Sequence, residues 1–388
     1  MVAIGKQLLS DGFDVTISLA EPYADVASSA GLRPISLLTT EEFDKTLANA
    51  NVWRPITGAR TVLGWVVENF MRQHFDVIQS QHQPGKTVLV SHPLDLGSRV
   101  FREVDSQTPL VDIHLAPAIL RVPSSPAKLT PWKLEVRRPA WAVRGMYWVA
   151  DHFGVDPVVK SKLNAFRREH GLEPVSRILK DYWLSPDRIV AMYPQWFAPE
   201  TSMYSPRLVH AGFPLQDFGD NTLAESIDSR PFVFTAGTAN HHCREFFEIA
   251  AKACQRIQHP GILLSTHRDN FPDDLPSCVQ TAEFIPLGQL LPKCAAIVHH
   301  GGVGTTSQAL ASGTPQVIRP MAFDQFDHAE RIQRLGVGCW LKNDKRLESA
   351  LRSCLEPAVV DKCKQVADRF GKSAIETAAS EIRSALQI

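Results

Sequence analysis

The feature that most constrains the fold of this 388-residue chain is a glycine-rich turn between two short apolar runs. The run at 295–298, Ala-Ala-Ile-Val, fits a buried strand, and His-His-Gly-Gly-Val-Gly follows it. Thr305 and Thr306 are good N-caps, so we expect a helix over 307–312 that ends at Gly313. The second apolar run, 316–318, would be the next strand. This order predicts a βαβ unit of a parallel sheet.

The turn also has the chemistry of a phosphate site. Glycines let the backbone approach a ligand, and a helix start presents unpaired N–H groups with a partial positive charge. His300 and Thr305 add side-chain donors. A Walker loop is absent because no Lys precedes the Ser/Thr, and the G-x-G-x-x-G pattern that starts at Gly302 reaches Ser307 instead of a third glycine. The local pattern therefore fits an ordinary glycine-rich turn equally well.

Asp324 and Gln325 come just after the second strand of this unit. In doubly wound sheets, ligands bind beyond the carboxyl ends of the strands. A carboxylate accepts from two neighbouring hydroxyls, and an amide both donates and accepts. The pair therefore suits a sugar, and the alternative is a solvated loop.

Residues 284–338 resemble the donor-binding signature of the UDP-glycosyltransferases, glycosyltransferase family 1. The similarity is greatest to the branch of bacterial and fungal sterol and antibiotic glycosyltransferases. The matching segments are F-I-P-L-G-Q-L-L-P at 284–292, H-H-G-G-V-G-T-T at 299–306, G-T-P-Q at 313–316 and D-Q-x-x-H-A-x-R at 324–331. The resemblance implies an α/β protein of the GT-B fold, with two facing Rossmann-like domains.

The resemblance also implies a set of donor-binding residues. They are Thr238, Phe284, His300, Gly302, Val303, Gly304, Thr305, Gln308, Asp324 and Gln325. Phe284 stands where many relatives carry a Trp that stacks on the nucleobase, and Leu287 replaces a Gln of plant relatives. The family has no bound metal at its donor site and uses no cofactor. The nucleotide-diphosphate sugar is a co-substrate. Adjacent histidines rarely reach one ion, so we do not expect a metal at His241, His242 and Cys243.

The first half of the chain resembles an acceptor domain without its beginning. Residues 2–38 read as helix, strand, helix and strand, which implies a parallel sheet. The family starts one strand earlier, with a Gly-His turn whose His is the general base, and no residue here matches that base. Asp95, near the end of the strand run 87–91, is a candidate for orienting such a base, and His92 is a weaker candidate. For both, a plain loop residue is the preferred interpretation.

Four prolines within 194–214 predict an interdomain linker. We therefore expect an acceptor-binding domain at 1–205, incomplete at its N-terminus, and a nucleotide-sugar donor-binding domain at 206–388. In GT-B proteins the last helix crosses back to the first domain, and residues 359–386 have helical spacing.

Residues 117–150 hold five prolines and the tryptophans Trp132, Trp141 and Trp148. In the family this region lines the acceptor pocket, and exposed aromatic faces suit an apolar acceptor. Ordinary core tryptophans are the preferred interpretation.

The composition narrows the classes of partner. Lys+Arg and Asp+Glu both number 41, which argues against a nucleic-acid partner but leaves room for a local membrane-binding patch. No run of 18 apolar residues and no signal peptide is apparent, so we expect no transmembrane segment. The seven cysteines lie from Cys243 onward, without a C-x-x-C pair, and indicate a reduced cytoplasmic protein.

Together these features predict an inverting glycosyltransferase that moves a sugar from a nucleotide-diphosphate donor to a hydroxyl of a small lipophilic acceptor. The first alternative is a catalytically impaired nucleotide-sugar binding protein, because the base is unmatched. The second is another GT-B enzyme, such as a nucleotide-sugar epimerase, which would need a suitable pair of carboxylates.

Overall fold

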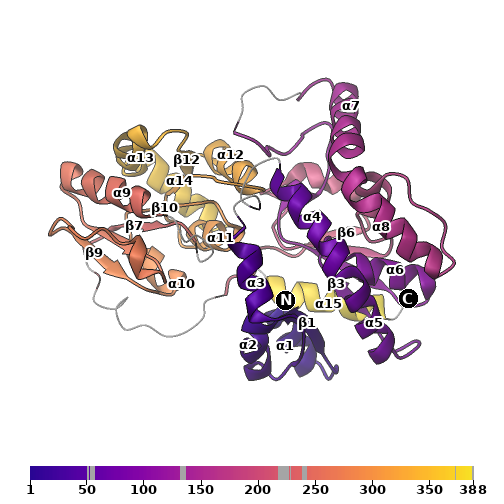
Figure 1. The fold of residues 1–388 in the computed structure, drawn as a ribbon. Helices are drawn as coiled ribbons and strands as arrows, with labels where there is room; N and C mark the ends of the chain where they lie inside the picture. The colour runs from indigo at the N-terminus through magenta and orange to yellow at the C-terminus, as the bar shows by residue number, and fades with distance from the viewer. Residues whose placement is uncertain are drawn as a thin grey trace. The chain divides into compact units, whose positions relative to one another are not determined.

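The computed structural model describes residues 1–49, 52, 57–131, 137–216, 227, 229–237, 243–371 and 373–386. The chain divides into two compact units, shown in Figure 1. Unit 1 comprises Met1–Ala127, Trp132–Phe213 and Lys372–Ile388, and unit 2 comprises Lys128–Pro131 and Pro214–Gly371. Within the described ranges, every helix is too short or too polar to traverse a bilayer.

Unit 2 is built on a parallel sheet of six strands in the order β12-β11-β10-β7-β8-β9. Its strands are β7 (Phe232–Thr235), β8 (Gly261–Leu264), β9 (Val279–Ala282), β10 (Ala296–His299), β11 (Gln316–Ile318) and β12 (Gly338–Trp340). Its helices are α9 (Arg244–Ile257), α10 (Leu287–Leu290), α11 (Val303–Ala311), α12 (Gln325–Leu335), α13 (Leu347–Cys354) and α14 (Pro357–Ala367). Short 3₁₀ turns lie at Arg268–Asn270, Leu291–Lys293 and Asp344–Arg346.

The sheet of unit 2 is buried on both faces, which explains its short, continuous apolar strands. Phe232 and Phe234 of β7 pack in one cluster with Phe247 of α9. Val233 and Ile297 belong to a second cluster, which includes leucines of the 287–291 region. The alternating faces of β7 and β10 therefore hold the helices on either side and fix where each strand ends.

Unit 1 contains two parallel sheets, β1-β2 and β3-β4-β5-β6. Its strands are β1 (Thr16–Ala20), β2 (Arg33–Leu38), β3 (Leu89–Ser91), β4 (Leu110–His114), β5 (Arg188–Ala191) and β6 (Leu208–His210). Its helices are α1 (Val2–Ser10), α2 (Ala24–Ser29), α3 (Thr40–Leu47), α4 (Thr57–Asn69), α5 (Met71–Gln81), α6 (Leu96–Val104), α7 (Ala140–Ala150), α8 (Asp156–Glu169) and α15 (Ala374–Ala385). Single turns lie at Glu21–Tyr23, Pro117–Ile119, Asp151–Val155, Ile178–Tyr182 and Pro199–Tyr204. Among the described residues, β1 pairs only with β2, and β3 only with β4.

The C-terminal helical segment is shared between the units. α14 belongs to unit 2, whereas α15 belongs to unit 1 and packs its alanines and Ile382 against Val111 and Ile113 of β4. Arg383 of α15 also pairs with Asp11, and Glu381 lies 3.3 Å from Arg188. The chain thus returns to unit 1 after completing the sheet of unit 2.

Candidate functional site

The candidate site lies in unit 2, at the carboxyl ends of β7 and β10. The chain runs from β7 outward to β8 and β9, and then returns to β10 on the other side of β7. The junction between β7 and β10 is therefore the topological switch point, where open α/β sheets bind their ligands. The His-His-Gly-Gly turn follows β10 directly.

The helix after this turn begins earlier than the sequence predicted. α11 starts at Val303 rather than at 307, with Gly302 as its N-cap and without a side-chain cap. The threonines are therefore in the first turn, and the N–H of Thr306 makes the first intrahelical bond, 3.0 Å to the carbonyl of Gly302. In the described part of the chain, the N–H groups of Val303, Gly304 and Thr305 have no acceptor. They are free to bind an anion.

His300 lies between two glycines at this helix start. A Cβ on Gly237 would lie 2.5 Å from His300 Cε1, and one on Gly302 would lie 2.4 Å from its Nε2. Gly237 also has a φ of 85°, which favours glycine. The Nδ1 atom of His300 is buried without a hydrogen-bond partner. The two glycines therefore hold the imidazole beside the free N–H groups.

The protonation of His300 follows from its surroundings. Burial lowers the pKa of His300 below its usual value, and the charge of His328 acts in the same direction, whereas Asp324 opposes both. Without a ligand the ring is therefore neutral near pH 7. Its unpartnered Nδ1 is therefore a buried hydrogen-bonding group that a ligand could satisfy.

Three further side chains hold the turn in place, and the sequence analysis gave them no role. The Gly301 N–H donates to His299 Nδ1 at 3.1 Å, so His299 carries its proton on Nε2 and donates it to Gln316 Oε1 at 3.0 Å. Burial lowers the pKa of His299 to about 3, which keeps it neutral. His328 Nδ1 donates to the carbonyl of Gly301 at 2.7 Å. For His299 and Gln316 the sequence signal was a polar residue at the end of an apolar strand run, whereas His328 lies in α12.

The Asp324-Gln325 pair at the start of α12 is only partly available to a ligand. The Gln325 side-chain oxygen accepts from the N–H groups of Met321 and Ala322, at 2.8 and 3.0 Å. The expectation that this amide both donates to and accepts from a sugar is therefore wrong, because only its NH₂ group remains. The Asp324 side chain is 31% exposed and lies 3.8 Å from His328 Nε2, so its carboxylate is open to solvent.

The other predicted donor residues lie around this turn or outside the described residues. Gln308 is buried, and its Nε2 donates to the carbonyl of Gln216 at 3.1 Å. Phe284 follows β9 and is 47% exposed, as a stacking platform would be. Thr238, like His241 and His242, lies outside the described residues. In the part of the chain that the structure describes, no group of three His, Cys, Asp or Glu could hold a metal.

In unit 1, Asp95 has a local structural role. It caps α6 by accepting from the N–H of Ser98 at 3.0 Å, and it pairs with His74 Nδ1 at 2.8 Å. Burial alone would raise the pKa of Asp95, but His74 and the bonds from Ser98 outweigh burial and lower it. Both carboxylate oxygens are therefore engaged inside unit 1. Its role in orienting a base stays a prediction.

A second polar cluster lies at the carboxyl end of β4. Asp112 is fully buried and accepts from Ser91 and Ser185 at 2.8 and 2.6 Å, and from Arg99 at 2.9–3.0 Å. Burial opposes ionisation, but Arg99 and His114 hold the pKa of Asp112 at about 2. His114, on the same strand, is fully buried and lies 3.6 Å from Asp112.

His92 lies next to this cluster but is a poor base. Its Nδ1 accepts from the N–H of Leu94 at 3.3 Å, so its proton is on Nε2. Burial, with the charges of His114 and Arg99, lowers the pKa of His92 to about 4. The Nε2 atom of the neutral ring is therefore a donor.

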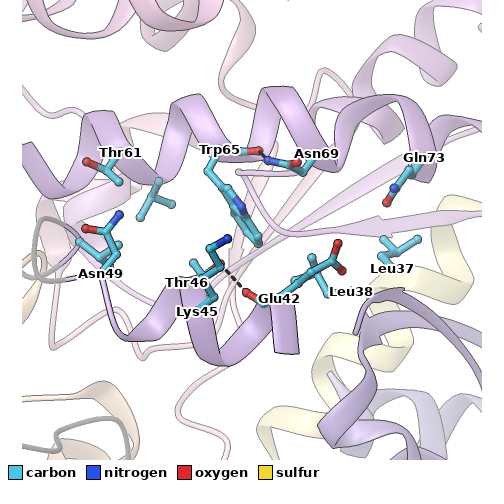
Figure 2. A pocket seen from close by; sticks show the side chains of 12 residues that line it. Leu37, Leu38, Glu42, Lys45, Thr46, Asn49, Thr61, Trp65, Asn69 and Gln73 are labelled. Carbon is cyan, nitrogen blue, oxygen red and sulfur yellow. Dashed lines mark hydrogen bonds between the residues drawn. The ribbon is translucent and has the colours of Figure 1, made fainter. Parts of the chain in front are cut away.

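Unit 1 also has a cavity of about 350 Å³ at the carboxyl end of β2, between α3 and α4. Figure 2 shows the ring of Trp65 reaching from α4 toward α3, with Glu42, Lys45 and Asn69 around it. Leu38, Val52 and Val62 add apolar walls. An apolar wall with a few polar groups is typical of a small-molecule site.

The interpretation of Trp141 and Trp148 as core residues is wrong. Both lie on α7, where they are 73% and 49% exposed. α7 docks on unit 1 by the opposite side, through the buried Val143 and through Tyr147, whose ring lies 4.7 Å from the guanidinium carbon of Arg121. Trp132 lies outside the described residues.

Sequence comparison places the donor region among known families. Residues 261–381 match the family model "Erythromycin biosynthesis protein CIII-like, C-terminal domain". Aclacinomycin-T 2-deoxy-L-fucose transferase of Streptomyces galilaeus is 39% identical over 24% of this chain and 23% of its own length. Sterol 3-beta-glucosyltransferase of Debaryomyces hansenii is 37% identical over 25% of this chain and 6% of its own. The chain thus spans less than a quarter of these relatives.

Solved structures are similar to the whole chain. The glycosyltransferase of kitacinnamycin superposes with a TM-score of 0.72 at 17% identity, covering 99% of this chain and 93% of its own. The spinosyn rhamnosyltransferase SpnG, in complex with thymidine diphosphate, gives 0.67 at 17% identity, covering 99% and 95%. These similarities show the GT-B fold. The family match covers residues 261–381, and the solved structures extend the similarity in fold to the whole chain.

Proposed function

We propose that the protein is a glycosyltransferase whose unit 2 binds a nucleotide-diphosphate sugar at the start of α11. The observation that carries this proposal is the uncapped helix start, with free N–H groups at residues 303–305 beside the unpartnered Nδ1 of His300. A diphosphate satisfies both kinds of donor. The thymidine diphosphate in the SpnG structure supports a thymidine or uridine diphosphate as the nucleotide.

The donor loop would act mainly on the leaving group. Negative charge develops on the diphosphate as the bond to the sugar breaks, and the N–H groups of the α11 start stabilise it. His300 adds a hydrogen bond. This bond becomes stronger when the charge of the phosphate raises the pKa of the ring and the ring is protonated. The exposed Asp324 carboxylate and the NH₂ group of Gln325 hold sugar hydroxyls. We propose direct displacement with inversion, without a metal.

The acceptor would bind in unit 1. The cavity beside Trp65 has the size and the mixed lining that a small hydroxylated ring compound needs. The similarity to an aclacinomycin-T 2-deoxy-L-fucose transferase and to a sterol 3-beta-glucosyltransferase supports a lipophilic acceptor. Cys243, Cys254, Cys278, Cys294, Cys339, Cys354 and Cys363 are all free, which supports a reducing, cytoplasmic location.

A second candidate function is nucleotide-sugar binding with impaired transfer. It is favoured by the hydrogen bonds of the titratable groups at the strand ends of unit 1, which leave no obvious general base. Asp95 and Asp112 are engaged in internal bonds, and His92 offers a donor instead of a base. General-base catalysis is typically worth about 10²–10⁴-fold, so a chain without a base would bind the donor and transfer slowly.

One experiment separates these functions. Calorimetry with thymidine and uridine diphosphate measures donor binding, and transfer from the matching glucose donors to phenolic and sterol acceptors is then followed by mass spectrometry. Binding with transfer at an ordinary rate supports the transferase, and binding without transfer supports the impaired protein. The absence of nucleotide binding would overturn both. Proton NMR of the product's anomeric coupling tests inversion, and excess EDTA tests metal independence.

A further inference from the structure

We propose that the exposed aromatic face of α7 docks the protein on an anionic lipid surface. This face consists of Trp141, Trp148 and Val149, together with Phe153 in the turn that continues the helix. Figure 1 shows α7 at the periphery of unit 1. The inference goes beyond the transfer reaction and does not depend on donor binding.

The helix presents this face by its spacing. Positions 141, 145, 148 and 152 fall on one stripe of an α-helix. Trp141 is 73% and Phe153 64% exposed, whereas Val143 on the opposite side is fully buried. A Cβ added to Gly145, which lies between the two tryptophans, would meet nothing within 4 Å. The stripe is therefore open along its length.

The aromatic rings at the end of the face support one another. Trp148 stacks on His152 with centroids 5.1 Å apart and an interplanar angle of 5°, and Phe153 meets both rings edge-on. This arrangement holds large apolar surfaces in solvent, where they cost free energy unless something covers them. Trp and Phe are the side chains that insert at the boundary between headgroups and acyl chains.

The charges around the face favour anionic lipid headgroups as its binding partner. Over 137–155, the exposed charged side chains are Arg138 and Arg144, and Arg144 borders the stripe, one helical turn from each tryptophan. The one acid in 137–155, Asp151, is buried and pairs with Arg121 at 2.6 Å. Aromatic rings flanked by arginines, without an exposed acid, complement anionic headgroups. An overall net charge of +0 would otherwise give the protein no attraction to such a surface.

The test is vesicle sedimentation of the full chain with phosphatidylcholine vesicles, with and without phosphatidylglycerol. We expect binding to the anionic vesicles and little to the neutral ones. The double variant Trp141→Ser/Trp148→Ser loses about tenfold or more, since each ring buries a large apolar area. Arg144→Glu loses roughly thirtyfold, since each charge near the surface contributes about fivefold. Met203→Ser, a 59% exposed apolar residue outside the face, is the matched control and binds like the wild type.

Thermal melting and thymidine diphosphate binding of each variant show whether the fold is retained. Failure of the wild type to bind anionic vesicles would overturn the proposal. Equal loss in the Met203→Ser control would overturn it as well. Light scattering tests the main competing occupant: a dimer that dissociates in the Trp141→Ser/Trp148→Ser variant would assign the face to a second copy of the chain.

Discussion

Replacing His300 should weaken nucleoside diphosphate binding by an amount that depends on pH. At a pH where the ring stays neutral in the complex, it provides an ordinary hydrogen bond of about 0.5–1.5 kcal/mol, or roughly twofold to tenfold in Kd. Where the bound ring is protonated, the bond is charge-assisted and contributes about 1.5–3 kcal/mol, or roughly tenfold to hundredfold. The loss in His300→Ala should therefore grow as the pH falls.

The direction of this pH dependence follows from the environment of the His300 ring. Burial and His328 lower the pKa of free His300, and Asp324 opposes them only in part. A bound diphosphate adds negative charge beside the ring and raises its pKa. The complex therefore binds more protons than the free protein, and affinity rises as the pH falls through the pKa of the complex. Below the lower pKa of the free protein, the gain levels off.

Calorimetry with thymidine diphosphate from about pH 8.5 to about pH 5.5 measures this effect. The terminal phosphate of the ligand titrates in the same range, so His300→Gln is the matched control. That variant keeps an N–H donor but cannot titrate, and its pH dependence is that of the ligand and the remaining protein. The difference between wild type and His300→Gln isolates the imidazole. Identical pH profiles in the two proteins would refute the assignment of His300 to the phosphate.

Four other substitutions test the remaining parts of the proposed sites. Asp324→Asn should leave the affinity for free thymidine diphosphate unchanged and weaken nucleotide-sugar binding; equal loss of both would assign Asp324 to the phosphates or the fold. Gly302→Ala should weaken nucleotide binding at least as much as His300→Ala, because its Cβ would lie 2.4 Å from the imidazole, whereas Gly304→Ala meets no protein atom and should raise the melting temperature. Trp65→Ala should raise the KM for the acceptor without changing the Kd for thymidine diphosphate, and an unchanged acceptor KM would remove the α3–α4 cavity from the acceptor site.

The strands and the turn of the candidate site were predictable because they depend on local sequence. The apolar runs that became β10 and β11 are bounded by glycine and proline, and strands of a buried parallel sheet need little more. The start of α11 was predicted four residues late. The prediction was based on the capping side chains of Thr305 and Thr306. The helix instead begins at Val303, and its N-cap Gly302 makes no side-chain cap bond, which is tolerable if a ligand supplies the acceptor.

Two of the three supporting contacts of the turn could not be predicted, since they join residues distant in the chain. His299 meets Gln316 because β10 and β11 pair in parallel register, Ile297 beside Gln316 and His299 beside Ile318. His328 reaches Gly301 across 27 positions. A single sequence shows these residues as matches to a motif but does not show that one histidine fixes the next peptide group. Only the fold makes the turn rigid enough to leave its N–H groups free.

The surfaces of unit 1 are hard to predict from sequence for the same reason. Apolar spacing in α7 favours a buried helix, yet burial depends on what packs against the helix, and unit 1 covers only the side of Val143. Conversely, Asp112 and Arg99 read as surface charges, yet they are buried because each neutralises the other. In both cases the sequence pattern gives the periodicity, but the neighbouring elements determine which side chains are buried. A site for a diphosphate can therefore be recognised from one local sequence motif. A surface that binds an acceptor or a membrane is formed by several elements, so it can be identified only from the structure.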